Sequence, residues 1–287
     1  MKRIYCKEML LCFACLFLLG SCKGGGIEAA APGPGSGAGS GDNGNAGTLS
    51  YIFKEKTEGY SCFRIPAIVK TKSGVLLAFA EARKNNCGDA GDIDLVVKRS
   101  ADNGQTWGET IMVWNDGSNT CGNPVPVIDE SNGRVILLMT WNLGEDNLGA
   151  INAGTSKDTR RVFVTSSDDE GKTWAAAKEI TKAVKQPGWG WYGTGTCHGI
   201  QLKQGKYAGR LVIPCDYMSL KTAGSPSRDS AHIIYSDDHG ATWKLGGIVN
   251  RDHAAESSVA ELSSGQLTLN IRNSSGGARL VASSADG

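Results

Sequence analysis

Five charged residues have side chains suited to binding a carboxylate and moving a proton. Arg64, Arg83 and Arg272 carry guanidinium groups, which stay charged and form paired hydrogen bonds with carboxylates. Asp89 and Glu256 carry carboxyl groups, which transfer protons when their surroundings tune them. Because 208 residues separate Arg64 from Arg272, only the fold can bring these groups together.

An eight-residue pattern, S-x-D-x-G-x-T-W, orders the chain. Its copies lie at residues 100–107, 167–174, 236–243 and, incompletely, 284–286. Successive copies begin 67, 69 and 48 residues apart, which indicates a repeat architecture. The aspartate of each copy can accept hydrogen bonds from its own turn, so we expect these aspartates to be structural and not catalytic.

Apolar segments bounded by Gly, Asn and Ser surround every copy, as strands do. Four-stranded antiparallel units in series predict an all-β fold, a β-propeller. The predicted strands are 65–70, 75–81, 93–100 and 110–114; 125–129, 134–141, 161–166 and 177–181; 199–203, 210–215, 231–236 and 245–250; and 258–262, 266–272 and 279–283.

Strand direction assigns residues to the two faces of such a fold. Connections alternate between the ends of an antiparallel unit, so all the repeated turns lie on one face. The longer loops and the crossings between units lie on the other face, and they carry the unusual residues Arg64, Arg83, Asp89, Asn123, Trp141, Asp146, Glu256 and Arg272. We expect these side chains to meet above the central axis, where a ligand would bind.

The tetrapeptide Phe63-Arg64-Ile65-Pro66 stands just before the first predicted strand. Together with the repeated turns, it resembles the bacterial and animal sialidases from about Gly59 to the end of the chain. The resemblance implies a six-bladed propeller that removes terminal sialic acid from sialylated glycans. It also implies a retaining mechanism with no cofactor and no metal.

The resemblance gives the charged residues roles. Arg64 and Arg272 match two members of a three-arginine clamp for the carboxylate of sialic acid, and Arg83 matches the arginine beside its O4 substituent. Asp89 matches the general acid that protonates the departing oxygen and later activates water. Two nearby aspartates are rivals for that role: Asp92 and Asp94.

Glu256 matches the glutamate that activates a tyrosine nucleophile, with Glu261 as a rival. A neutral tyrosine would not repel the carboxylate of the substrate as a carboxylate nucleophile would. Asn123 and Trp141 match positions that line the pocket for the N-acetyl and glycerol groups. His198 lies on a predicted loop of the same face, where it either shapes the loop or touches the sugar.

The repeats supply three full blades and most of a fourth. The resemblance places the tyrosine nucleophile and the third clamp arginine beyond Gly287, so we expect little or no hydrolysis by this chain alone. Three alternatives are a trans-sialidase, a sialic-acid-binding propeller without catalysis and a purely structural repeat protein.

The first residues read as a targeting segment. A basic start and a short apolar run end in Leu19-Gly20-Ser21-Cys22, which resembles a bacterial lipoprotein signal. We predict a signal peptide over 1–21, lipid on Cys22, a flexible linker over 22–48 and a partial propeller over 49–287. A simple secretory signal is the alternative. The lipid would be the only membrane contact of an exported protein, in the periplasm or at the outer membrane and cell surface.

Composition sets further bounds. A net charge of +1 argues against bulk electrostatic binding of nucleic acid or of an anionic membrane. The five cysteines after Cys22 form no CxxC pair, which argues against a zinc site. Their odd number leaves at least one free thiol, and the sequence does not give the pairing.

Overall fold

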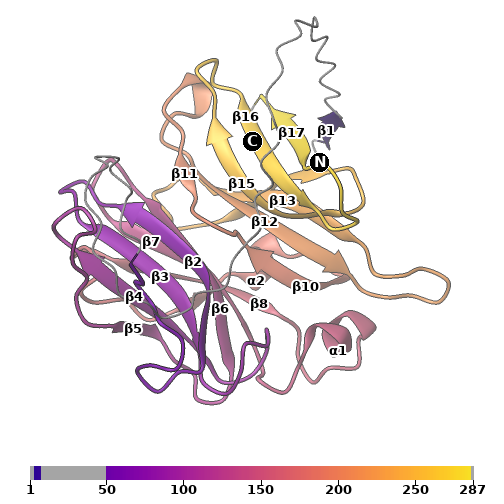
Figure 1. Cartoon of the computed structure of the whole chain (residues 1–287). Helices are drawn as coiled ribbons and strands as arrows, with labels where there is room; N and C mark the ends of the chain where they lie inside the picture. The colour runs from indigo at the N-terminus through magenta and orange to yellow at the C-terminus, as the bar shows by residue number, and fades with distance from the viewer. Residues whose placement is uncertain (1–2, 8–49, 286–287) are drawn as a thin grey trace, which may run out of the picture. The chain divides into compact units, whose positions relative to one another are not determined.

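The computed structural model describes residues 3–7 and 50–285 and is almost entirely β (Figure 1). The strands after residue 50 form four consecutive antiparallel units. Unit 1 contains β2 (Cys62–Lys70), β3 (Leu76–Arg83), β4 (Ile93–Ser100) and β5 (Ile111–Trp114). Unit 2 contains β6 (Thr120–Ile128), β7 (Val135–Asn142), β8 (Arg161–Ser167) and β9 (Lys178–Glu179). Unit 3 contains β10 (Trp189–Thr194), β11 (Ile200–Gln201), β12 (Leu211–Ser219), β13 (Asp229–Ser236) and β14 (Lys244–Val249), and unit 4 contains β15 (Ala254–Glu261), β16 (Leu267–Asn273) and β17 (Leu280–Ser284).

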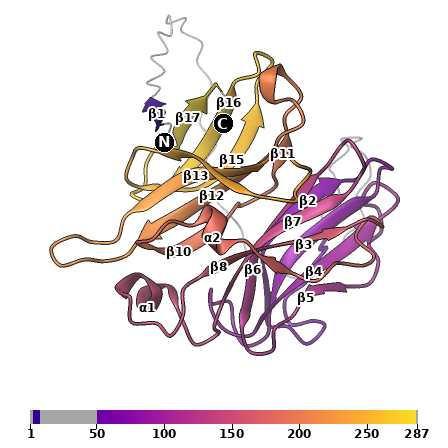
Figure 2. The same ribbon diagram turned by 180° about the vertical axis from the view of Figure 1, so that it is seen from behind.

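Two open sheets hold these strands, one for units 1 and 2 and one for units 3 and 4 (Figure 2). Arg3–Lys7 forms β1, which pairs antiparallel with β17 and parallel with β14. These five residues belong to the predicted signal peptide. Cys22 and the predicted linker up to 48 lie outside the described residues, so the targeting and lipidation predictions stay predictions.

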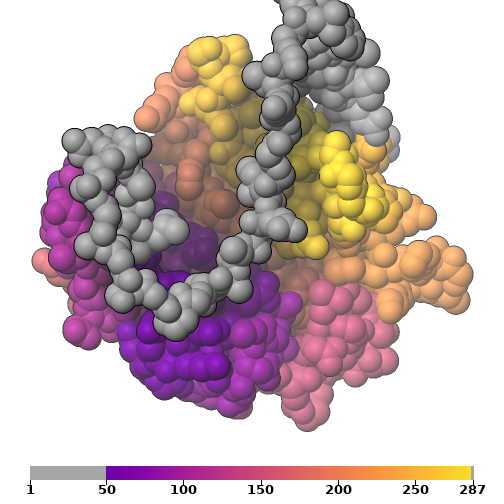
Figure 3. All heavy atoms as spheres, viewed as in Figure 1, coloured from indigo at the N-terminus to yellow at the C-terminus, as the bar shows by residue number. Residues whose placement is uncertain are grey.

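Short helices connect some strands: α1 (Leu148–Ala153), α2 (Thr181–Val184) and the 3-10 helix η1 (Gly205–Tyr207). Within residues 3–7 and 50–285, no helix is long and apolar enough to cross a membrane. Apolar side chains fill the space between consecutive units (Figure 3). Val125 and Ile136 of unit 2, for example, share one buried cluster with Ile213 and Ile234 of unit 3.

The inner strands differ most from the prediction. They begin three to five residues earlier than expected in units 1, 2 and 4. Each carries an irregularity in its register, between Arg64 and Ala67 in β2, between Gly122 and Val125 in β6, and between Ala254 and Ser257 in β15. A bulge inserts a residue and re-aims the side chains beside it. Arg64, Asn123 and Glu256 therefore lie inside strands at these irregularities, and not in the preceding loops.

In unit 3 the inner strand is divided. The prediction gave one strand over 199–203, whereas the structure has β10 and the short β11, with Gly195–Gly199 between them. The stretch Trp189–Thr194 alternates Trp, Gly and Tyr, so it lacks the aliphatic pattern that identified the other strands. Because β10 reaches the loop face, His198 does not, and it lines a cavity with Ile68 and Val127 in the middle of the inner strands.

The repeated turns are held by their aspartates, as predicted. In the second copy, Asp169 Oδ1 accepts hydrogen bonds from the Ser167 hydroxyl at 2.7 Å and from the Thr173 amide at 2.9 Å. The Thr173 hydroxyl donates to Asp169 Oδ2 at 2.6 Å. The first and third copies repeat this arrangement around Asp102 and Asp238.

The same turns also join neighbouring units, which the sequence did not predict. The residue after the aspartate is Glu170 in the second copy, and its Oε1 accepts a hydrogen bond from Thr71 of unit 1 at 3.1 Å. In the third copy it is His239, whose Nδ1 lies 2.8 Å from Asp129 Oδ2 of unit 2. Each turn therefore fastens its unit to the first hairpin of the unit before it.

We expect Asp169→Asn to lower the melting temperature at pH 7 by about 3–6 °C, since the turn loses one or two hydrogen bonds in a domain of this size. The hydrogen bonds from Thr173 lower the pKa of Asp169 to about 2 from 3.8. This stabilisation is present above the ordinary pKa and is lost as the pH falls towards the folded one, so the difference between variant and parent shrinks from about pH 4 to about pH 2. Thermal scans over this range measure it.

Asp168→Asn is the control for that measurement. The Asp168 side chain is 70% exposed and pairs with Arg134 on the surface, where ion pairs contribute little. We expect its melting temperature to match the parent. Equal losses in the two variants would contradict the structural role of Asp169.

Candidate functional site

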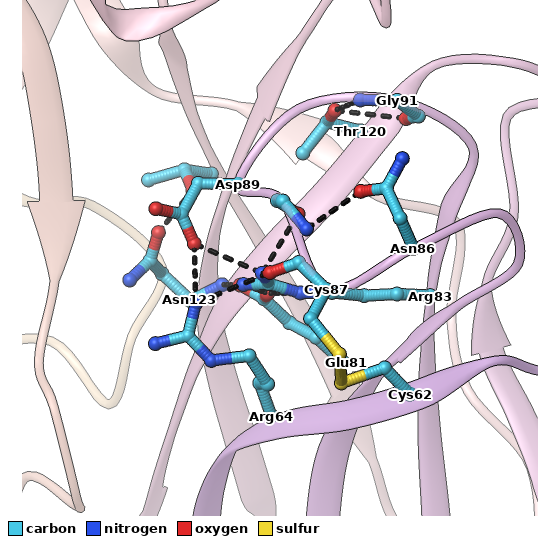
Figure 4. A network of polar contacts seen from close by, with 12 residues as sticks. Cys62, Arg64, Glu81, Arg83, Asn86, Cys87, Asp89, Gly91, Thr120 and Asn123 are labelled. Atoms are coloured by element: carbon cyan, nitrogen blue, oxygen red, sulfur yellow. Dashed lines mark hydrogen bonds and ion pairs between the residues drawn. A yellow bond between two sulfur atoms is a disulfide. The ribbon is translucent and has the colours of Figure 1, made fainter. Parts of the chain in front are cut away.

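Three residues predicted to act together do converge at the loop face of unit 1 (Figure 4). Asp89 Oδ1 lies 2.8 Å from Arg64 Nη1 and 2.9 Å from Arg83 Nη1. Arg64 comes from β2, Arg83 ends β3, and Asp89 lies in the loop between β3 and β4. The side chains of Arg64 and Asp89 are 44% and 59% exposed, so a ligand can reach both.

A buried acid supports this group from below. The Glu81 carboxylate accepts hydrogen bonds from Arg83 Nε at 3.0 Å and from Arg83 Nη2. Its other oxygen accepts the Asn123 amide at 2.7 Å. Glu81 and Arg83 are both almost fully buried. Position 122 is a glycine of necessity, because a Cβ there would lie 2.6 Å from Glu81 Oε1.

Arg160 connects this group to units 2 and 3. Its Nη2 donates to Asn123 Oδ1 at 2.5 Å and its Nη1 donates to Asn142 Oδ1 at 2.6 Å. The guanidinium carbon lies 3.8 Å from the ring centroid of Trp191, a cation–π geometry. Burial lowers the pKa of Arg160 to about 10, and the charges of Glu81 and Asp89 oppose that effect, so the group stays cationic at neutral pH.

Glu256 and Arg272 form a second pair in unit 4. Arg272 Nη1 lies 2.7 Å and 2.9 Å from the two Glu256 oxygens. Both side chains keep access to solvent, with exposures of 34% for Glu256 and 59% for Arg272. The prediction that these two residues share one face with a ligand therefore agrees with their direct contact.

Asp216 lies between the two groups electrostatically. It stands opposite Gly193 of β10, at the register level where Glu81 stands opposite Arg64. Burial raises the pKa of its carboxyl well above the ordinary value; Glu256 adds to this, and Arg160 and Arg272 oppose it. Its Oδ1 has no hydrogen-bond partner within the described part of the chain. A neutral carboxyl group thus occupies the floor between Arg160 and the Glu256–Arg272 pair.

The rival acids are engaged elsewhere. Asp92 Oδ1 lies 3.0 Å from Lys84 Nζ. Asp94 is buried and accepts hydrogen bonds from Tyr60 Oη at 2.8 Å and from Asn115. Glu261 accepts the backbone amides of Lys203 and Gln204. These contacts leave Asp89 and Glu256 as the candidate acids nearest the arginines.

Trp141 is the one predicted site residue that the structure does not join to this network. Its Nε1 donates to Asp116 Oδ2 at 2.7 Å, and Arg161 lies 5.4 Å from its ring centroid. Thr140 and Asn142, its neighbours on β7, contact Asn123 and Arg160 instead. Alternation along the strand explains this, because adjacent side chains point to opposite faces.

Sequence reasoning missed Glu81, Arg160 and Asp216. Glu81 and Arg83 stand two residues apart in the otherwise apolar strand β3. Side chains at this spacing share one face of a strand, so the pattern was a readable signal for a buried ion pair. Arg160 and Asp216 gave no such signal, because their partners come from other units.

The comparisons with known proteins decide the family. Residues 74–287 match the model of the BNR repeat-like domain. Over 241 residues the chain is 34% identical to the exo-alpha-sialidase of Aspergillus fumigatus, covering 78% of this chain and 55% of the relative. The sialidase of Bacteroides fragilis is 32% identical, over 79% of this chain and 42% of the relative. The chain belongs to the BNR-repeat sialidase family.

Solved structures place this sialidase-family chain in the same fold. Hadza microbial sialidase Hz136 superposes with a TM-score of 0.71 at 31% identity, covering 80% of this chain and 45% of that one. Trypanosoma rangeli sialidase in complex with the inhibitor DANA gives a TM-score of 0.61 at 25% identity, covering 78% and 36%. The predicted propeller of sialidase type is thereby confirmed. Six blades stay a prediction, since the described strands form no closed sheet.

The chain spans about half the length of the curated relatives that it matches. The activity of a whole relative is therefore not carried over directly. For this chain, the family and fold are established, and the roles of its charged residues follow from the geometry as a proposal.

Proposed function

We propose that this chain forms the acid-bearing part of the active site of an exo-α-sialidase, which hydrolyses terminal sialic acid from sialylated glycans with retention of configuration. The observation that carries the proposal is the meeting of Arg64 and Arg83 on Asp89, with Glu256 on Arg272, in a sialidase-family fold. Two exposed arginines that each hold a carboxylate in the free protein suit a ligand that brings a carboxylate of its own.

Substrate binding would exchange these carboxylates. The carboxylate of sialic acid competes with Asp89 for Arg64 and with Glu256 for Arg272, because one guanidinium presents a limited set of donors. Both acids are then released from an arginine at the moment when the substrate arrives. Arg83 is buried and fixed by Glu81, so it stays in place beside Asp89.

The proposed chemistry has two steps. In the first, Asp89 donates a proton to the departing glycosidic oxygen while Glu256 accepts the proton of the nucleophile. In the second, Asp89 takes a proton from water, which releases sialic acid. We assign the nucleophile to no tyrosine of this chain. Tyr192 is fully buried, with its hydroxyl 2.8 Å from His232 Nε2, and Tyr235 lies 4.0 Å from Arg210 beside the third repeated turn.

A fluorogenic sialoside tests the proposal. The chain would be assayed alone and extended at its C-terminus by two further propeller units, with circular dichroism to confirm folding. We expect release of sialic acid from the extended form and little from the chain alone; the form that turns over is the active form below. NMR of the first product should show the α-anomer. Inversion, or no turnover by folded protein of either length, would refute the proposal.

Added lactose distinguishes the transferase alternative. We expect free sialic acid to remain the main product when lactose is present. A dominant sialylated lactose product would replace the hydrolase by a trans-sialidase. Binding of DANA without turnover in either form would indicate a binding propeller.

A further inference from the structure

A disulfide joins β2 to the loop that carries Asp89. Cys62 begins β2 and Cys87 lies in the loop, with their Cα atoms 5.4 Å apart (Figure 4). Cys121, Cys197 and Cys215 are free thiols. The bond therefore fixes a point of the loop two residues before Asp89 onto the strand that carries Arg64.

Further contacts hold the loop on both sides of Asp89. The carbonyl oxygens of Cys87 and Gly88 accept hydrogen bonds from Arg83 Nη1, the second at 2.7 Å. Past Asp89, the Gly91 amide donates to Thr120 Oγ1 at 3.0 Å, and the Thr120 hydroxyl donates to the Gly91 carbonyl at 2.9 Å. Asp89 thus lies between two fixed points on an exposed loop.

This arrangement does more than the fold requires. Asp89 is 59% exposed, and an exposed loop carboxylate is normally free to move. Here Arg83 contacts both the loop backbone and the Asp89 carboxylate, so a displaced loop would lose both contacts together. A small displacement of a catalytic group can reduce a rate strongly while leaving binding intact.

We propose that the Cys62–Cys87 disulfide positions Asp89 for proton transfer, so that turnover depends on the oxidised state of this pair. The role of Asp89 here rests on the proposed function. The cysteines act through Asp89 and do not themselves touch the substrate. Cys87 is exposed, so a reductant can reach it.

The first test needs no activity. Dithiothreitol passes two electrons and two protons to the disulfide, giving two thiols and the cyclic disulfide of the reagent. Hydrogen exchange of the chain before and after reduction reports on the loop. We expect the amides of Gly88 and Gly91 to exchange at least about tenfold faster after reduction, while those of β6 and β7 keep their rates. Unchanged loop exchange in protein shown by thiol counting to be reduced would overturn the positioning role.

The second test uses the active form. We expect Cys87→Ser to lower kcat about 10- to 100-fold and to leave KM within about twofold, because Arg64 and Arg272 still hold the substrate carboxylate. Reduction of the parent should give the same loss, and reoxidation should restore kcat. Cys197→Ser is the matched control, since it makes the same change at an exposed free thiol.

The two tests separate the failure of this inference from that of the proposed function. If Cys87→Ser does not fold, reduction of folded parent protein replaces it. A kcat that survives loss of the bond overturns the inference while leaving the sialidase proposal intact. Faster loop exchange in a protein that never hydrolyses a sialoside would support the restraint on Asp89 and remove its catalytic meaning.

Discussion

Asp89→Asn is expected to lower kcat/KM of the active form on a sialylated oligosaccharide by about 10³-fold. An amide cannot donate the proton that the departing sugar oxygen needs, and it cannot accept the proton of water in the second step. Arg64 and Arg83 would keep the side chain in place, because the amide oxygen can still accept one hydrogen bond from them. Steady-state kinetics on sialyllactose measure the effect.

The leaving group gives this prediction a second, sharper readout. An aryl leaving group with an acidic phenol departs with little protonation, so the Asn variant should lose far less on the fluorogenic sialoside, about tenfold. A structural defect would lower both rates equally. Equal losses on the two substrates would therefore contradict the assignment of Asp89 as the general acid.

Asp92→Asn is the matched control for Asp89→Asn. Asp92 lies three residues further along the same loop, and its carboxylate pairs with Lys84 and not with the arginines. We expect its kcat/KM to stay within about threefold of the parent on both substrates. A loss at Asp92 as large as the loss at Asp89 would transfer the acid role to Asp92.

The sequence was sufficient to predict the convergence at Asp89. The repeated turn occurs at a fixed place in each unit, so it marks one face of the fold and puts every second-to-third loop on the other. This alternation brought Arg64 and Asp89 to one end of unit 1 before any coordinates were considered. Local patterns suffice where a site depends only on strand order and direction.

Local geometry within the strands was beyond the sequence. Ile65 and Asn123 adopt φ values of 53° and 51°, which non-glycine residues rarely take. Their conformations are imposed by the register irregularities of β2 and β6, which depend on the partner strands. The placement of Arg64 and Asn123 within strands could not be read from the residues themselves.

Contacts between distant segments were equally hidden. Five cysteines allow many pairings, and only the fold puts Cys62 beside Cys87. Asp216 lies at the end of the otherwise apolar strand β12, where its sequence neighbours give no reason for a charged residue. Its surroundings come from Arg160, Glu256 and Arg272, which belong to other strands and loops.

Glu81→Gln is expected to reduce the free energy of unfolding by about 3 kcal/mol, because removing one partner of a buried ion pair leaves the other charge uncompensated. The side chains of Glu81 and Arg83 are 3% and 2% exposed, so water cannot replace the lost carboxylate. The neutral amide would also oppose Arg83 Nε with a weaker acceptor. Urea unfolding at pH 7 measures the difference.

Glu179→Gln makes the same substitution at a surface pair, where Arg161 lies 3.5 Å from the carboxylate and both side chains are about two-fifths exposed. We expect a loss of at most about 0.5 kcal/mol there. Arg83→Met combined with Glu81→Met removes both buried charges, and we expect it to recover part of the stability lost in Glu81→Gln. The recovered protein should lack the contact between Arg83 and Asp89, and so fold without the geometry proposed for proton transfer. A double variant less stable than Glu81→Gln would show that the pair holds unit 1 together in a way that apolar packing cannot replace.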